Sequence, residues 1–173
     1  MVKTAESEFG RLDVWVNNAG MEIKAPTHEV SLDDCKVIAI NQTGVFLGAR
    51  CFELFLDHHQ PGNIINITSV HEQIPWPTFA SYTAAKGAVK LFTETIAMEY
   101  ANRRIRVNAI GPGAIETPIN AEKFADKAQY DQTVAMIPQG RLGKPEDVAA
   151  EQPGWHRQSQ VTSPARPYLL TVG

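Results

Sequence analysis

The chain has 173 residues, of which 43% are hydrophobic and 20% charged, with a formal net charge of −3. That length is sufficient for one packed core, so we expect one domain. A slightly acidic chain without a basic block lacks the electrostatic footprint of a nucleic-acid or anionic-membrane protein, and no apolar run approaches the roughly 18 residues of a membrane span. We therefore expect a protein that acts on a small molecule.

The cysteine content points to a reducing compartment. Cys35 and Cys51 are the two cysteines of the chain, with no CxxC pair, and the first residues lack the pattern of a signal peptide. Chains of this kind keep reduced thiols. We therefore expect a cytoplasmic protein without disulfides.

The first sixty residues predict a helix, a strand and a second helix. Residues 1–10 are typical of the end of a helix that stops at Gly10. Residues 12–16 (LDVWV) form a short apolar run typical of a parallel strand, and residues 17–20 (NNAG) indicate a tight turn after it. Ser31 is suited to cap a helix that we expect to continue to Leu56 before Pro-Gly closes it.

The next fifty residues repeat the alternation. Residues 63–68 (NIINIT) and 105–110 (IRVNAI) predict two further strands, and apolar residues at three- and four-residue steps predict a helix over residues 82–101. Residues 111–113 (GPG) then turn the chain out of the last strand. Strands that alternate with helices of crossover length predict an α/β fold with a doubly wound parallel sheet. Ligands in such sheets bind beyond the carboxyl ends of the strands.

Three polar side chains are expected at that edge. Tyr82 and Lys86 stand four residues apart, which places them on one face of a helix. Ser69 follows a buried strand, and its hydroxyl should face that helix. Each signal alone has an ordinary explanation: a Tyr four before a Lys is common, a strand-end serine can bond its own backbone, and NNAG is often only a turn. No stretch has metal-ligand spacing.

In order and spacing, these residues resemble the short-chain dehydrogenase/reductase family. The resemblance rests on NNAG after a strand, Asn41 in a helix, Ser69 after the next strand, Tyr82-x-x-x-Lys86, and Pro112-Gly113 after the third, and it covers residues 12–150. It implies a Rossmann-type fold and a small-molecule alcohol or ketone substrate. It also implies a homo-oligomer, either a dimer or a tetramer. The catalytic residues that it implies are Asn41, Ser69, Tyr82 and Lys86.

The resemblance also implies NAD or NADP as the cofactor. The residues expected to contact it are Asn18, Ala19, Gly20, Tyr82, Lys86, Pro112, Gly113, Ile115 and Thr117. Tyr82 would be the base, and because a free tyrosine titrates near pH ~10, Lys86 and the positive nicotinamide are expected to lower its pKa. Ser69 would hold the substrate oxygen, Lys86 would also bind the ribose, and Asn41 would position a water molecule.

Within the family, the wording SVHEQIPWP and IGPGAIETPINAEKFAD is most similar to bacterial glucose 1-dehydrogenases. This similarity implies oxidation of glucose to the lactone, with Glu22, His71, Gln73 and Ala114 at the substrate. Other substrates of the family, such as a steroid or an acyl-carrier ketone, share the same catalytic residues. A different class of function is also open, namely an inactive remnant that binds other subunits.

Two parts of the family pattern are not found. The glycine-rich turn that binds the pyrophosphate does not occur, so we expect a partial Rossmann-type sheet that lacks its first βαβ half. Residues 1–150 follow the family, whereas residues 151–173 are rich in Gln, Pro, Arg and Ser. If the codons from Gln152 onward are regrouped, so that the third base of each joins the first two bases of the next, the genetic code permits the sequences AWLAS and ASYVTGTTLFVDGG. These resemble the family's final helix and strand. We therefore expect a frameshift after Ala150, a disordered tail and no last strand.

Overall fold

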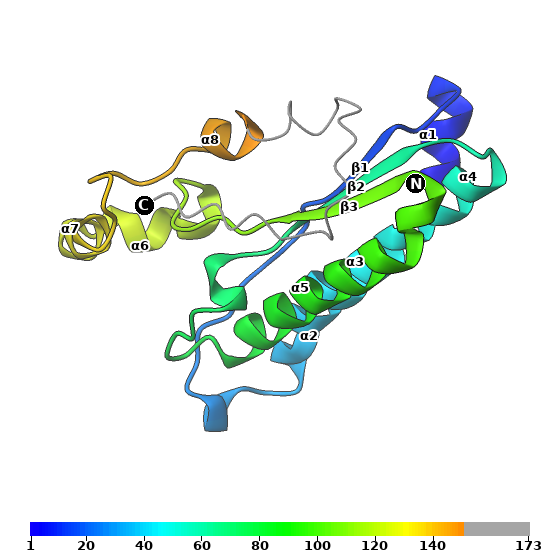
Figure 1. The fold of residues 1–173 in the computed structure, drawn as a ribbon. Helices are drawn as coiled ribbons and strands as arrows, with labels where there is room; N and C mark the ends of the chain where they lie inside the picture. Colours follow the sequence, from blue (N-terminus) through cyan, green and yellow to red (C-terminus); the bar gives the residue numbers. More distant parts are fainter. Residues whose placement is uncertain (151–173) are drawn as a thin grey trace.

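A computed structural model describes residues 1–150 of the chain, and the expectations for residues 151–173 lie outside the described residues. Its centre is a parallel sheet of three strands in the order β1 (Val14–Asn17), β2 (Gly62–Ile67) and β3 (Ile105–Ile110). The strands begin and end within two residues of the predicted positions. The predicted α/β fold with a partial parallel sheet is therefore confirmed for the described part of the chain (Figure 1).

The helices connect the strands as the alternation predicts. The longest is α5 (Ala80–Tyr100), which follows β2 and precedes β3. The other α-helices of residues 1–150 are α1 (Val2–Phe9), α2 (Lys36–Ile38), α3 (Gly44–Gly48), α4 (Phe52–Asp57), α6 (Ala121–Ala125), α7 (Lys127–Ala135) and α8 (Pro145–Ala150). Short 3₁₀ turns lie at Thr27–Glu29, Asp33–Cys35, Ala49–Cys51, Val70–Glu72, Ala101–Arg103 and Pro118–Asn120.

The continuous α-helix predicted from Ser31 to Leu56 is wrong in its interior. The N-terminal cap is present, because Ser31 Oγ accepts a hydrogen bond from the Asp34 N–H at 3.2 Å and Asp34 Oδ2 accepts one from the Ser31 N–H at 3.0 Å. The helical segment that follows, from α2 through α4 and called the rod below, is interrupted by a π-helical turn at Ala39–Thr43 and a 3₁₀ turn at Ala49–Cys51. Such π turns are often found at functional sites, and this one contains Asn41.

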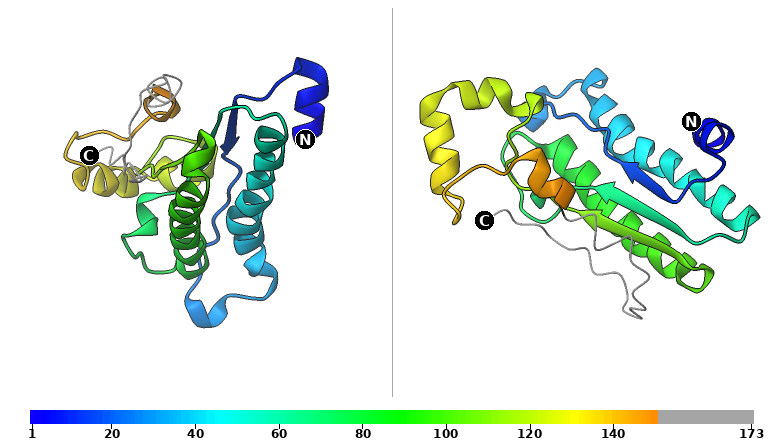
Figure 2. Two further views of the ribbon diagram at one scale, coloured as in Figure 1. Left: turned by 45° about the vertical axis from the view of Figure 1, so that its right-hand side comes forward. Right: turned by 90° about the horizontal axis from the view of Figure 1, so that it is seen from above.

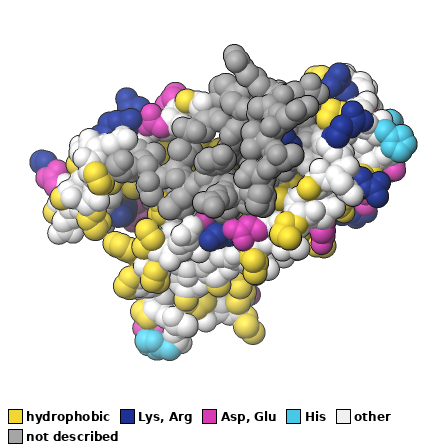
Figure 3. Space-filling view, in the orientation of Figure 1, with side chains coloured by type: hydrophobic (Ala, Val, Ile, Leu, Met, Phe, Trp, Pro, Cys, Tyr) yellow, Lys and Arg dark blue, Asp and Glu magenta, His cyan; other side chains and the backbone are white. Residues whose placement is uncertain are grey.

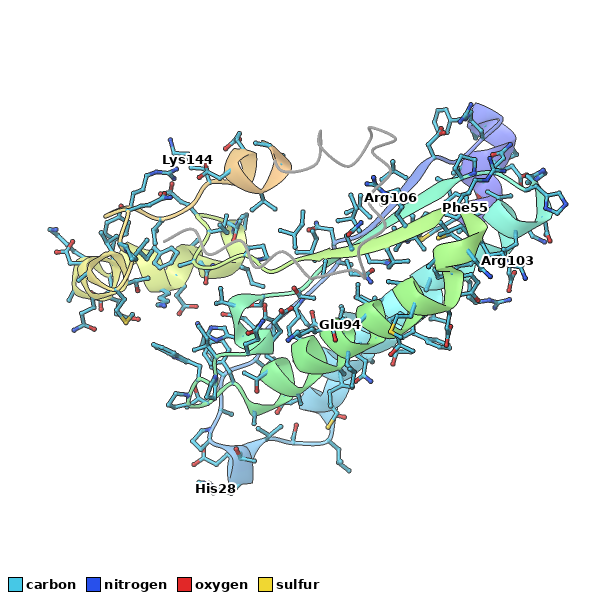
Figure 4. All side chains as sticks on the ribbon, in the orientation of Figure 1. His28, Phe55, Glu94, Arg103, Arg106 and Lys144 are labelled. Atoms are coloured by element: carbon cyan, nitrogen blue, oxygen red, sulfur yellow. The ribbon has the colours of Figure 1, made fainter. Side chains whose placement is uncertain are left out.

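The helices are distributed unevenly around the sheet. The rod α2–α4 and helix α5 cover one face side by side, whereas α6, α7 and α8 lie beyond the carboxyl ends of the strands (Figure 2). The core between the sheet and the two helices contains Phe55, Ile64, Ile96 and Val107, all buried. The Phe55 side chain, labelled in Figure 4, comes from α4 at the opposite end of the sheet from α6 and α7.

Two glycines allow the rod to approach the sheet closely. A Cβ atom on Gly62 would lie 2.4 Å from the Phe55 ring, and one on Gly48 would lie 1.9 Å from Asn17 Oδ1. Real side-chain contacts are not that short, so any larger residue would push helix and sheet apart. The glycines therefore set the spacing between the two layers.

Candidate active site

A pocket of about 1370 Å³ opens at the carboxyl edge of the sheet. Its floor is formed by the ends of β1 and β2 and by the loops that follow β2 and β3, and the start of α5 and the helices α6 and α7 form its sides. This is where open parallel sheets bind ligands, because the loops that leave successive strands diverge there. The position agrees with the expectation from the sequence.

Ser69 and Tyr82 come together in this pocket from different elements. Ser69 follows β2 and is buried, and its Oγ accepts a hydrogen bond from the His71 N–H at 3.2 Å. This bond caps the 3₁₀ turn Val70–Glu72 and fixes the serine side chain. Tyr82 is in the first turn of α5 and half-buried, and it lines the same pocket as Ser69. The structure therefore brings the serine and the tyrosine to one pocket, with the Ser69 hydroxyl near enough to lower the pKa of the Tyr82 phenol.

Lys86 lies one helical turn after Tyr82 and is almost completely buried, with 4% of its surface exposed. Its Nζ donates a 2.7 Å hydrogen bond to the Ile67 carbonyl at the end of β2 and lies 5.6 Å from the centre of the Tyr82 ring. Burial lowers the pKa of the Lys86 ammonium to about 8, while the Glu72 carboxylate acts in the opposite direction. The strand end therefore anchors the lysine beside the phenol.

The electrostatics of Tyr82 depend on burial and on two neighbouring groups. Burial raises the pKa of the phenol above its ordinary value, the Ser69 hydroxyl lowers it in part, and the Glu22 carboxylate raises it further. The expectation joined Lys86 with the positive nicotinamide, so it concerns the site with its cofactor and stays a prediction; in the chain by itself, desolvation of the phenolate is the largest effect. A phenolate at neutral pH therefore needs a further positive charge in the pocket.

Asn41 holds the loop that follows β1. It is fully buried, its Nδ2 donates to the Met21 carbonyl at 2.7 Å, and its Oδ1 accepts from the Met21 N–H at 3.1 Å. The neighbouring Gly20 has no space for a side chain, because a Cβ atom there would lie 2.8 Å from Asn41 Oδ1. The π turn thus clamps the backbone after NNAG against the pocket, a contact that spacing did not predict.

Most of the residues expected at the cofactor reach the pocket. Of those outside α5, the ones that line it are Asn18, Gly20, Pro112, Gly113, Ile115 and Thr117, whereas Ala19 does not. The backbone continues the pairing of β2 and β3 past their ends, since the Thr68 N–H donates to the Ile110 carbonyl at 2.7 Å and the Val70 N–H donates to the Pro112 carbonyl at 3.0 Å. This pairing holds the loop 111–113 beside Ser69.

The residues expected at the substrate are divided. Glu22, His71 and Ala114 line the pocket, but Gln73 does not, and its amide donates to Glu72 Oε1 at 3.3 Å. Gln73 follows the 3₁₀ turn Val70–Glu72, where a shift of one position turns a side chain away from its neighbours. The structure therefore brings three of these four residues to the pocket.

The pocket also has walls that the sequence analysis did not single out. They include Lys24, Trp76, Phe79, Lys123 and Phe124. The His71 ring lies 5.9 Å from Trp76 and 5.6 Å from Phe79, centre to centre, which makes a continuous aromatic side next to Tyr82. The aromatic residues just before α5 were a usable signal, whereas nothing in the sequence places Lys123 near Lys24.

A chain of buried polar groups behind the pocket fixes the strands. The Asn17 amide donates to Asn66 Oδ1 at 2.8 Å, and the Asn66 amide donates to Thr93 Oγ1 at 2.8 Å. Thr93 in turn donates to the Val89 carbonyl at 2.7 Å. These bonds tie β1, β2 and α5 together, so Tyr82 and Lys86 are carried on an element with a defined position relative to the sheet.

A parallel sheet with Ser, Tyr and Lys at its carboxyl edge is typical of Rossmann-type oxidoreductases. A family model described as enoyl-(acyl carrier protein) reductase matches residues 1–151. The chain belongs to the short-chain dehydrogenase/reductase family of oxidoreductases.

Several characterised relatives resemble the chain in sequence. It is 56% identical over 144 residues to 3beta-hydroxysteroid dehydrogenase 1 of Eggerthella lenta, which covers 82% of this chain and 55% of that protein. It is 44% identical over 153 residues to glucose 1-dehydrogenase 2 of Bacillus subtilis, which covers 87% of this chain and 59% of that protein. The chain therefore spans less than two thirds of the length of these relatives.

Solved structures agree with this fold. A gluconate 5-dehydrogenase from Burkholderia cenocepacia in complex with NADP and tartrate superposes with a TM-score of 0.82 at 32% identity, over 87% of this chain and 59% of that one. A 4-hydroxyisoleucine dehydrogenase complexed with NADH gives a TM-score of 0.85 at 29% identity, over 90% and 65%. The described residues thus share the architecture of nicotinamide-dependent dehydrogenases.

Residues 1–150 lack two further features. No helix in this part is long and apolar enough to cross a membrane. The same residues contain no group of three or more His, Cys, Asp and Glu side chains that could hold a metal ion.

Proposed function

We propose that the chain carries the reaction centre of an NAD- or NADP-dependent oxidoreductase that oxidises a secondary alcohol. The observation that supports this most directly is the convergence of Ser69, Tyr82 and Lys86 in one pocket at the carboxyl edge of a parallel sheet. The three residues come from a strand end and a helix, and buried hydrogen bonds hold two of them in place. A mere surface cluster would not be anchored in this way.

The residues present fit the nicotinamide ribose half of the cofactor. Gly20 lines the pocket, and Lys86 uses one of its three donors on the Ile67 carbonyl, which leaves others for ribose hydroxyls. Asn18, Ile115 and Thr117 line the same side. The glycine-rich turn that would hold the pyrophosphate does not occur in the sequence. When bound, the oxidised nicotinamide supplies the hydride acceptor and a positive charge.

The protein groups then divide the work. Ser69 Oγ accepts from the His71 N–H, so its own hydrogen can be donated to a substrate oxygen. Tyr82, as the phenolate, takes the proton of the substrate hydroxyl. Lys86, held by β2, places an ammonium 5.6 Å from the ring centre and favours the phenolate. Asn41 positions the loop that carries Gly20, because it forms two hydrogen bonds with the backbone of Met21.

For the substrate, we propose a hydroxyl on a steroid-like ring system. The pocket wall includes Ile74, Trp76, Phe79, Phe124 and Met136, which suits a large apolar body, and the relative that is 56% identical is a hydroxysteroid dehydrogenase. Glucose is the second candidate. It is favoured by the polar Glu22 and His71 in the wall and by the 44% and 42% identical glucose 1-dehydrogenases.

The test is an assay of the purified chain with a 3β-hydroxysteroid or glucose and either NAD or NADP, in which reduced nicotinamide is followed. Turnover that is lost in Tyr82→Phe supports the proposal. Cofactor titration in parallel separates failure to bind from failure to react. If the chain shows neither cofactor binding nor turnover, the alternative function remains, namely a fragment that binds other subunits.

A specific surface favours association with a second copy of the chain. Phe46 and Leu47 of α3 are exposed by 58% and 56%, and Leu91 and Met98 of α5 by 65% and 75%. Figure 3 shows hydrophobic side chains over the part of the surface that α5 forms. We propose a homo-oligomer through α3 and α5, tested by light scattering of the wild type and of Leu91→Glu.

We also propose that the family domain ends at Ala150 and that residues 151–173 are read in a shifted frame. The end of the family match at residue 151 supports the boundary. Sequencing the coding DNA tests this hypothesis. If the codons for residues 152–173 do not translate to AWLAS and ASYVTGTTLFVDGG in the shifted frame, the hypothesis is wrong.

A further inference from the structure

Three charged side chains besides Lys86 line the pocket, and the proposed chemistry uses none of them. They are Glu22, Lys24 and Lys123. The first two follow β1, whereas Lys123 is on α6, about a hundred residues later. Their presence among apolar and aromatic walls needs an explanation, because ionic groups are costly to remove from water unless they meet a partner.

Glu22 and Lys24 form an ion pair. Glu22 Oε1 and Lys24 Nζ are 3.0 Å apart, with the glutamate side chain 16% and the lysine side chain 41% exposed. Lys24 Nζ also lies 5.3 Å from the centre of the Phe79 ring, in the aromatic wall. One positive charge is thus held at the wall and compensated by one negative charge.

Lys123 lines the same pocket as this pair, close enough for its charge to interact with both residues. Burial lowers the pKa of its ammonium, the like charge of Lys24 lowers it further, and the Glu22 carboxylate raises it. Lys123 has no ion pair among those found in residues 1–150. Glu22 is the one acidic side chain in the described wall, so the group retains a single uncompensated positive charge.

We propose that the pocket takes an alcohol whose other end carries a carboxylate, and that the ammonium groups of Lys24 and Lys123 bind this carboxylate. The inference rests on the proposed function and names the substrate class. A single negative charge matches the single excess positive charge of the group, and the apolar wall accommodates the body between the two ends. The local charge is opposite to the net charge of −3 of the whole chain, so it is not a general surface property.

Removal of the Glu22 charge should act on anion binding in the direction opposite to removal of a lysine charge. Its carboxylate repels an anion, so the substrate carboxylate lies on the side of Lys24 that faces Lys123. Removal of the Glu22 charge should tighten binding of an anion, whereas removal of either lysine charge should weaken it. A neutral ligand of the same shape should respond to none of these changes.

The experiment is calorimetric titration of the full chain with 3β-hydroxyandrostane-17β-carboxylate and with its methyl ester. We expect the acid to bind more tightly than the ester. Lys24→Gln and Lys123→Gln should each lower the affinity for the acid by about 3- to 10-fold, and Glu22→Gln should raise it. The affinity for the ester should change less than twofold in each variant. Lys127→Gln is the matched control, since Lys127 is 85% exposed and pairs with Asp131 outside the wall.

Equal binding of acid and ester, equal loss of both ligands in the lysine variants, or no binding of either ligand would overturn the inference. If a variant fails to fold by circular dichroism, the salt dependence of the wild type replaces it: the acid should weaken with added salt and the ester should not. The titration needs no cofactor, so absence of turnover would count against the proposed function alone.

Discussion

The two sides of the pocket are held in different ways. On one side, Ser69, Lys86 and Asn41 are buried and hydrogen-bonded to backbone groups of β2 and of the loops that follow β1 and β2. On the other side, Lys24 and Lys123 are partly exposed and belong to a loop and to the five-residue helix α6. Groups that perform chemistry need fixed positions, whereas groups that recognise the far end of a substrate tolerate movement. The comparison predicts large, localised effects on the first side and graded effects on the second.

The sharpest test of the buried side is Tyr82→Phe. The phenylalanine keeps the ring contacts, 6.0 Å to Phe79 and 6.3 Å to His71 between centres, and loses only the hydroxyl. Because a positioned acid or base contributes about 10²- to 10⁴-fold, we expect kcat to fall by that factor while the melting temperature changes little. Steady-state kinetics and a thermal melt measure both. A kcat within threefold of the wild type would remove Tyr82 from the chemistry.

Gly62→Ala tests the rigidity of the scaffold that carries the buried side. The new methyl group would lie 2.4 Å from the Phe55 ring, so α4 and β2 must separate. We expect a loss of about 1–3 kcal/mol in the free energy of unfolding, measured by denaturant titration.

Gly87→Ala in α5 is the matched control. Its methyl group would meet its nearest atom, the Glu72 carbonyl oxygen, at 3.8 Å, which is an ordinary contact. Alanine should stabilise the helix by roughly 0.5–1 kcal/mol. Equal effects of the two substitutions would contradict close packing at Gly62.

Lys86 predicts a pH dependence of stability. Its pKa is about 8 in the folded chain, compared with 10.5 for a lysine in water. Between these values the unfolded chain binds more protons than the folded chain, so stability should rise with pH from about 8 to 10.5, as far as this residue is concerned. Denaturant titrations across this range in wild type and Lys86→Met measure the effect. The rise should be smaller in the variant, and an identical slope in both would show that the lysine is not desolvated.

Phe124→Ala tests the exposed side of the pocket, and we expect it to have the smallest effect on catalysis. The ring lines the pocket from α6 and packs edge-on against Tyr130 at 6.2 Å between centres. Loss of this wall should raise the KM for a steroid alcohol by about 3- to 10-fold, because it removes apolar contact area, and should leave kcat within twofold. A fall in kcat as large as that of Tyr82→Phe would show that the two sides do not differ as we infer.

Prediction from the sequence succeeded where a short stretch of residues decides the outcome. The strands 105–110 and 63–68 were found because short runs rich in isoleucine and valine are typical of buried parallel strands. Tyr82 and Lys86 were placed on one face because a helix repeats every 3.6 residues. The helix after Ser31 was placed, but its π turn was not, because the buried contact between Asn41 and Met21 that accompanies it joins residues twenty positions apart.

The electrostatics of Tyr82 show a related limit of the sequence. Spacing places an ammonium near the phenol, which argues for a lower pKa, but it does not show how far the phenol is removed from water. Desolvation depends on residues from several elements, and it is the largest effect on the Tyr82 phenol in the chain itself. Gln73 shows the same limit on a smaller scale, since the direction of a side chain after a 3₁₀ turn depends on what packs around that turn.

The sequence by itself determined the α/β class, the order of the elements and the presence of Ser69, Tyr82 and Lys86 at strand and helix ends, because local periodicity and spacing encode these features. Only the tertiary structure decided which side chains face one another. The pair of Glu22 and Lys24, the side chain of Lys123 on α6 and the aromatic wall before α5 line one pocket, although these three groups come from segments far apart in the chain. Their proximity results from packing of loops and short helices around the end of the sheet, which no local pattern specifies.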